Sequence, residues 1–222
     1  MPLNPHWQRL RGFAPGRIVY VAGPSGAGKD SLLQYVRERV PANARVAFAH
    51  RYITRPVSGG AEHHIPLTMA EFDIRARAGF FAMHWHANGN GNGYGIGIEI
   101  EDWLRRGFQV IVNGSRGYIP EAREIFPELC LVWVDASTDV LKARLAQRGR
   151  ETATEIARRF ERSAALEAPA LVPDLHLQND RALADAGAQL LDFIVDLADR
   201  HRLHRQMQDG DAGNGKVVSQ LR

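Results

Sequence analysis

Short apolar runs alternate along the chain with longer segments in which apolar residues recur at helical spacing. The runs predict strands, and the segments between them predict helices. Predicted strands cover residues 17–22, 45–49, 80–85, 108–112, 129–134 and 174–178. Predicted helices cover residues 31–40, 69–78, 98–106, 120–126, 139–148, 154–167 and 181–202. Because strands alternate with helices, we expect an α/β fold in which helices flank a parallel sheet on both faces.

The most informative motif is the glycine-rich stretch of residues 23–31, Gly-Pro-Ser-Gly-Ala-Gly-Lys-Asp-Ser. It follows a predicted strand and opens a predicted helix, which is the context of a phosphate-binding P-loop. Glycines let backbone N–H groups turn toward phosphate oxygens, and a helix N-terminus favours an anion. Lys29 is placed to reach the outer phosphates of a nucleoside triphosphate.

One position departs from the usual P-loop pattern. Ser or Thr normally follows the lysine and contacts Mg²⁺ through its hydroxyl, but here that residue is Asp30. Three readings stay open for its carboxylate: it binds the metal directly, it acts through a bound water, or it leaves the metal to other ligands. Asn113, at the end of the predicted strand 108–112, is neutral, so we hypothesise that Asp30 supplies a carboxylate missing there.

Residues 51–107 interrupt the strand and helix alternation. They hold a capping box, Thr68 to Glu71, that opens a helix of their own, and a stretch rich in Gly and Asn, 88–93, that we expect to be a mobile loop. We interpret 51–107 as an acceptor-binding insert and the arginine-rich segment at about 144–165 as a lid. A single domain would then span residues 17–202, with its core at 17–50 and 108–202. The predicted loose termini are 1–16 and 203–222, with disorder from Asp209 onward.

Composition narrows the functional classes. The 222 residues carry 28 Lys and Arg against 25 Asp and Glu, a net charge of +3 that suits a phosphate-rich substrate. The arginines are spread along the chain, so we expect no nucleic-acid partner. Cys130 is the single cysteine, which excludes a disulfide within the chain. No apolar stretch approaches the ~20 residues that span a bilayer, and no signal-peptide core is visible, so we expect a cytoplasmic enzyme.

Several motifs together resemble the guanylate kinase superfamily, and within it the ribose 1,5-bisphosphate phosphokinases. They lie at residues 23–33, 51–56, 62–64, 85–89, 112–116 and 144–151. That narrower family shares the aspartate found at Asp30. The loop at 88–93 is longer than the family pattern, and His63 replaces an expected asparagine, so both departures concern the acceptor region.

The resemblance implies a P-loop NTPase fold and a reaction. The enzyme would use Mg·ATP to phosphorylate ribose 1,5-bisphosphate to 5-phosphoribosyl 1-diphosphate, with release of ADP, in phosphonate catabolism. Because the acceptor is itself a phosphate, we expect cations rather than a general base around it. A small phosphorylated sugar is the expected partner, and a homodimer stays open as an assembly.

The motifs and the resemblance assign candidate residues to each role. The catalytic candidates are Lys29, Asp30, Arg148 and Arg150. The candidates for binding ATP are Gly23, Pro24, Ser25, Gly26, Ala27, Gly28, Lys29, Asp30, Ser31 and Arg144. The candidates for binding the acceptor are Arg51, Tyr52, Arg55, Glu62, His64, Asn113, Ser115 and Arg116. Asp30 is the candidate metal ligand.

Two rival functions share parts of this motif pattern. A guanylate or other nucleoside monophosphate kinase is disfavoured because Asn113 and Ser115 stand where carboxylates would read guanine N–H groups. A guanylate-kinase-like binding module without activity typically loses the P-loop lysine and the lid arginines. This chain keeps Lys29, Arg148 and Arg150, which favours an enzyme.

Overall fold

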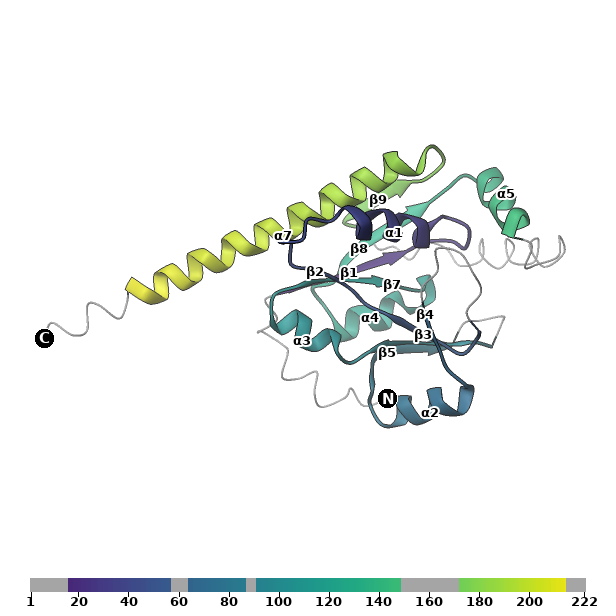
Figure 1. The fold of residues 1–222 in the computed structure, drawn as a ribbon, viewed down its shortest axis with the longest axis horizontal. Coiled ribbons are helices and arrows are strands. Elements are labelled where there is room, and N and C mark those ends of the chain that lie inside the picture. The colour runs from purple at the N-terminus through teal and green to yellow at the C-terminus, as the bar shows by residue number, and fades with distance from the viewer. Residues whose placement is uncertain (1–15, 57–63, 87–90, 149–171, 215–222) are drawn as a thin grey trace, which may run out of the picture.

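The structure, a computed structural model, describes residues 16–56, 64–86, 91–148 and 172–214, with the backbone alone at residue 148 and over 201–214. Its strands form two sheets (Figure 1). The strands of the second sheet all fall between residues 48 and 109 of the sequence, between two strands of the first. The lid predicted beyond Arg148, the helix predicted at 154–167 and residues 88–90 of the Gly/Asn-rich stretch lie outside the described residues.

The main sheet has five strands in the order β2-β7-β1-β8-β9, and every neighbouring pair is parallel. The strands are β1 (Ile18–Ala22), β2 (Val46–Phe48), β7 (Gln109–Asn113), β8 (Cys130–Asp135) and β9 (Leu175–Gln178). The predicted parallel sheet is therefore confirmed. β1 is buried along its whole length, as its unbroken apolar sequence requires of a central strand.

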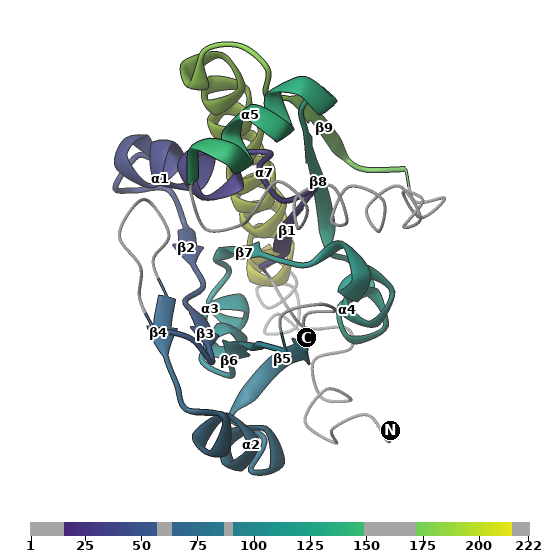
Figure 2. The ribbon, with the colours of Figure 1, turned by 90° about the vertical axis from the view of Figure 1, so that its right-hand side faces the viewer.

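Helices cover both faces of this sheet. Successive residues of β1 point to opposite faces, and those on each face pack against a different set of helices. Val19 and Val21 pack in one core with α1 (Lys29–Arg39) and α7 (Leu183–Asn214). Ile18 and Tyr20 pack in a second core with α3 (Ile100–Arg105) and α4 (Ile119–Ile125). Figure 2 shows α1 and α5 (Thr138–Arg148) together on the side of the main sheet that faces away from the second sheet.

The second sheet lies within residues 51–107. Its order is β4-β3-β6-β5, and it pairs strands in both directions. The strands are β3 (Arg51–Ile53), β4 (His64–Pro66), β5 (Phe81–His86) and β6 (Gly93–Gly97). Helix α2 (Met69–Arg77) packs on it through Phe72. Thr68 caps α2 as predicted, because its Oγ1 accepts a hydrogen bond of 3.1 Å from Glu71 N.

The sequence pattern predicts only β5 of this sheet and places Gly93 in a loop, which is wrong. Gly93 begins β6, where a Cβ atom would lie 2.8 Å from the Phe72 ring. A Cβ at Gly95 would lie 2.6 Å from the Phe81 ring. The glycines of β6 thus make room for aromatic rings that pack against the backbone, and they do not mark a turn.

The last helix is longer than predicted. α7 continues to Asn214, so the predicted end at residue 202 and the predicted disorder over 209–214 were wrong. The chain has no glycine or proline between Gly187 and Gly210, so nothing in its sequence stops the helix there. Figure 1 shows the C-terminal part of α7 extending away from both sheets. In the described part of the chain, none of the helices combines the length and apolarity needed to cross a membrane.

Candidate active site

The glycine-rich loop connects the end of β1 to the start of α1. Gly28 is the N-cap of α1 and has φ 88°, a backbone conformation that strongly favours glycine. A Cβ at Gly28 would also lie 2.5 Å from the Asn179 side-chain nitrogen. Lys29 Nζ donates to the carbonyl oxygens of Gly23 and Pro24, each at 2.9 Å. The ammonium group is therefore held across the loop, beside the N-terminus of a helix that favours anions.

Residues from later in the chain close around this loop. Asn179, just after β9, is 2% exposed, and its Nδ2 donates to Ala27 O at 2.7 Å. Arg144 of α5 comes so close that its Nη1 would lie 3.6 Å from a Cβ at Gly28. This buried nitrogen has no hydrogen-bond partner among the described residues. An arginine donor thus lies beside the loop, as expected of a group that binds ATP, although that role stays a prediction.

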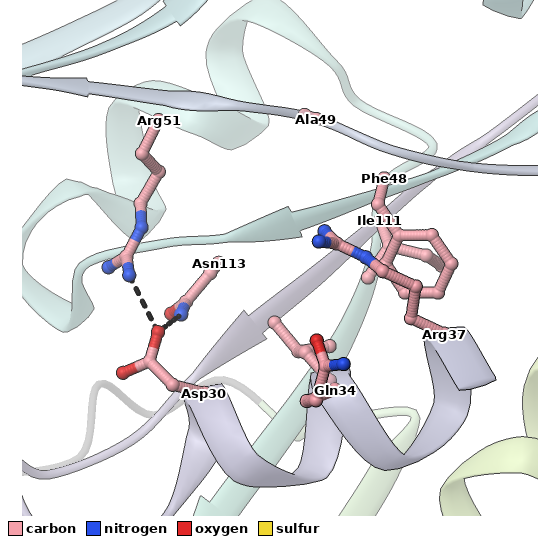
Figure 3. Close-up of a pocket in the computed structure, with 9 residues that line it drawn as sticks. Asp30, Gln34, Arg37, Phe48, Ala49, Arg51, Ile111 and Asn113 are labelled. Carbon is pink, nitrogen blue, oxygen red and sulfur yellow. Dashed lines mark hydrogen bonds and ion pairs between the residues drawn. The ribbon is translucent and has the colours of Figure 1, made fainter. Parts of the chain in front are cut away.

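Asp30 joins three elements that are far apart in the sequence. Its Oδ1 accepts hydrogen bonds from Arg51 Nη2 at 2.6 Å and from Asn113 Nδ2 at 2.8 Å (Figure 3). The side chains of Arg51 and Asp30 are 13% and 23% exposed, so this ion pair is only partly screened by water. The contact ties the first turn of α1 to β3 of the second sheet and to the end of β7. It brings the predicted metal ligand next to two predicted acceptor-binding residues.

Tyr20 fixes the turn that follows β7. Its hydroxyl donates to Ser115 O at 3.0 Å and accepts from Ser115 N at 2.9 Å. Burial raises the pKa of Tyr20 well above its usual range, and the hydrogen bond to the Ser115 backbone opposes this only in part, so the hydroxyl keeps its proton. A Cβ at Gly114 would lie 1.9 Å from the Tyr20 ring. The ring therefore packs directly against the backbone that carries Asn113 and Ser115.

Replacing Tyr20 with phenylalanine should lower the free energy of unfolding by about 1–3 kcal/mol, because Ser115 N and O lose a buried partner. Urea unfolding measures the change. Tyr35→Phe is the matched control, since the Tyr35 hydroxyl has no hydrogen bond in the described part of the chain, and we expect a change within about 0.5 kcal/mol there. Equal losses in both variants would show that the hydroxyl of Tyr20 does not hold this turn.

The other predicted acceptor residues lie in the second sheet, near it, or after β7. Tyr52 packs on the opposite face of β3 from Arg51, with its ring 5.6 Å from that of Phe81. His64 Nε2 lies 3.2 Å from Arg55 O, so these two predicted residues are adjacent. Burial lowers the pKa of Arg116, and the charge of Asp135 opposes that shift. Glu62 and Arg150 lie outside the described residues, and Arg148 is the last residue of α5.

A pocket opens between α1 and the strands β2 and β7 (Figure 3). It is lined by Asp30, Leu33, Gln34, Arg37, Phe48, Ala49, Arg51, Ile111 and Asn113. Sequence analysis did not single out Gln34 or Arg37. Their spacing of four and then three residues after Asp30 places all three on one face of α1, which was the available signal.

Comparisons with known proteins settle the family. No protein-family model matches the chain. The ribose 1,5-bisphosphate phosphokinase PhnN of Burkholderia pseudomallei is 50% identical over 182 residues, which cover 82% of this chain and 97% of that protein. This chain belongs to the ribose 1,5-bisphosphate phosphokinase family. A second member of the family, from Enterobacter lignolyticus, is 42% identical over 194 residues, 87% of this chain and 97% of the relative.

Two further relatives mark the limits of the likeness. The family member from Laribacter hongkongensis is 51% identical over 180 residues, 81% of this chain, but the chain spans only 42% of that protein's length. The solved guanylate kinase of Anaplasma phagocytophilum superposes with a TM-score of 0.58 over 82% of this chain and 86% of that one. At 16% identity it supports the shared fold alone.

Proposed function

We propose that this member of the ribose 1,5-bisphosphate phosphokinase family transfers the γ-phosphoryl group of ATP to the 1-phosphate of ribose 1,5-bisphosphate, in phosphonate catabolism. The products are ADP and 5-phosphoribosyl 1-diphosphate. The observation that carries the proposal is the 50% identity to a phosphokinase of that name over 97% of its length. The loop around Lys29 supplies the phosphate-binding geometry that such a reaction needs.

The chemistry requires positioning and charge neutralisation. An oxygen of the 1-phosphate attacks the γ-phosphorus, and the bond from that phosphorus to the oxygen retained by ADP breaks. The second pKa of a phosphate monoester is about 6, so the acceptor is largely an anion at neutral pH and needs no general base. Lys29, fixed across the loop at 2.9 Å from two carbonyl oxygens, holds the β- and γ-phosphates. Arg144 lies beside the same loop and adds a second cation.

The residues at the loop fit Mg²⁺. This ion is usually held by one or two carboxylates together with substrate phosphates and waters, so a large cage is not needed. Among the described residues there is no group of three or more His, Cys, Asp and Glu that could hold a metal. Asp30 supplies one carboxylate at the start of α1, and Ser31 follows it. Bound there, Mg²⁺ would neutralise phosphate charge. Arg51 and Asn113 orient the Asp30 carboxylate for this role.

Guanylate kinase activity is the rival proposal, and the end of β7 argues against it. Asn113 donates its amide to Asp30, and the Ser115 backbone is held by Tyr20. Neither residue is a carboxylate that could accept hydrogen bonds from guanine. We further propose that the second sheet, which carries Arg51 and Arg55, forms the acceptor-binding insert. A homodimeric assembly and a cytoplasmic location stay predictions.

A phosphoryl-transfer assay with Mg·ATP tests the proposal. Ribose 1,5-bisphosphate, ribose 5-phosphate and GMP are offered in turn as acceptors, and the products are resolved by ³¹P NMR. A new diphosphate signal from ribose 1,5-bisphosphate alone is the expected result. Turnover of GMP without turnover of the bisphosphate would replace the proposal with the guanylate kinase alternative.

A further inference from the structure

The pocket beside α1 contains a second cation, Arg37, to which the reaction described above assigns no role. Asp30, Arg51 and Asn113 form its inner end, next to the phosphate loop. Gln34 and Arg37 extend the polar lining along α1. The apolar lining between them comes from Leu33, Phe48, Ala49 and Ile111. The pocket thus has polar groups toward both ends and an apolar side between them.

Arg37 is a cation that forms no ion pair with a carboxylate in the described part of the chain. Its guanidinium lies over the Phe48 ring, 4.9 Å from the ring centroid, and it makes no hydrogen bond or ion pair with any described residue. Figure 3 shows its side chain extending from α1 across Phe48, on the side of the helix that carries Gln34 and Asp30. Burial lowers the pKa of Arg37. A planar cation that stacks on a ring and pairs with none of the described residues is well suited to an anionic ligand.

The spacing along α1 relates this cation to the reacting centre. Arg37 follows Asp30 by seven residues, which is about 10 Å along a helix axis. Long helical side chains lean toward the helix N-terminus, so the guanidinium lies nearer to the phosphate loop than its backbone does. A compact sugar with a phosphate at each end would place one phosphate at the loop and the other toward Arg37.

We propose that Arg37 binds the 5-phosphate of ribose 1,5-bisphosphate, the phosphate that does not accept the transferred group. Gln34 also lines the pocket, but its amide nitrogen donates to Glu38 Oε1 at 2.8 Å. This inference rests on the proposed function and deepens it, because it names a residue that selects a bisphosphate over a sugar with one phosphate. The pentose lies against Leu33 and Ile111, and the 1-phosphate faces Arg51 and the loop. The Phe48 ring holds the guanidinium in place, which limits the rotamer freedom lost on binding.

Steady-state kinetics of Arg37→Met test the inference. We expect KM for ribose 1,5-bisphosphate to rise about 10- to 100-fold, the range for losing charge-assisted hydrogen bonds to a phosphate, while kcat and KM for ATP stay within about threefold. Ribose 5-phosphate, used as an inhibitor competing with the bisphosphate, should lose affinity by a similar factor. Arg37→Lys keeps the charge but loses the planar donors, so its KM should fall between those of Arg37→Met and the unmodified protein.

Arg39→Met is the matched control. Arg39 lies on the same helix and also stacks on an aromatic ring, with its guanidinium 3.9 Å from the Tyr35 centroid, but it does not line the pocket. Equal KM values for the Arg37 and Arg39 variants would overturn the inference and leave the proposed function intact. A rise confined to KM for ATP would assign the pocket to the donor and overturn it too. Failure of the unmodified protein to convert ribose 1,5-bisphosphate would overturn the proposed function, and this inference with it.

Discussion

Replacing Lys29 with methionine should lower kcat for phosphoryl transfer about 1,000-fold, because a positioned cation acts on charge that develops in the transition state. Methionine keeps most of the side-chain length and removes the charge. The two hydrogen bonds to Gly23 and Pro24 that hold the ammonium group disappear with it. Initial rates with saturating Mg·ATP and ribose 1,5-bisphosphate measure the effect.

Lys142→Met is the control for this variant. Lys142 is exposed on α5, and the substitution makes the same change in charge at a solvent-exposed side chain, so we expect a rate close to that of the unmodified protein. Circular dichroism of both variants separates lost catalysis from lost folding. A Lys29→Met protein that is folded and retains more than about a tenth of the rate would contradict the assignment of Lys29 to catalysis.

Replacing Asp30 with serine should lower kcat about 100- to 1,000-fold and raise the Mg²⁺ concentration needed for half-maximal rate. Serine is the residue that usually follows a P-loop lysine, so the variant tests whether this chain requires a carboxylate there. The change also leaves Arg51 and Asn113 without the oxygen that accepts both of their hydrogen bonds. Rates measured across a Mg²⁺ titration give both quantities.

Asp30→Asn and Asp185→Ser sharpen that test. Asparagine keeps the shape of the side chain and removes its charge, so a loss as large as that of serine would show that charge is what matters. Asp185 is an exposed acid in the first turn of α7, and its replacement should leave the Mg²⁺ titration unchanged. An Asp30→Ser enzyme with an undiminished rate and the same Mg²⁺ dependence would contradict the proposal that Asp30 is a metal ligand.

The strands and loop that could be predicted are those whose signal is local. β1 and β8 are nearly continuous apolar runs, and the loop between β1 and α1 carries glycines whose spacing has a physical reason. β3 and β4 were missed because their three residues include polar residues or proline, whereas the equally short β2 is an apolar run. β6 was missed because its glycines serve neighbouring aromatic rings, which the sequence of the strand does not reveal.

In the candidate site, too, some features could be predicted from residue chemistry, and others depended on the tertiary structure. That Asp30 would complement the neutral Asn113 was a hypothesis from residue chemistry, and their 2.8 Å hydrogen bond now places them together. Which predicted residues share a surface depended on tertiary structure. Tyr52 and Arg51 are neighbours in sequence, but they lie on opposite faces of β3. Arg37 became a candidate only because the fold brings Phe48 and Ile111 beside α1.

The hydrogen bond from Asn179 to Ala27 spans 152 positions of the sequence. A ribosome makes the loop early and Asn179 late, so a growing chain cannot form this contact until nearly the whole main sheet has been synthesised. Closing so long a segment is slow compared with forming local contacts. Incomplete chains therefore contain the entire glycine-rich motif but lack the Asn179 side chain that donates to it.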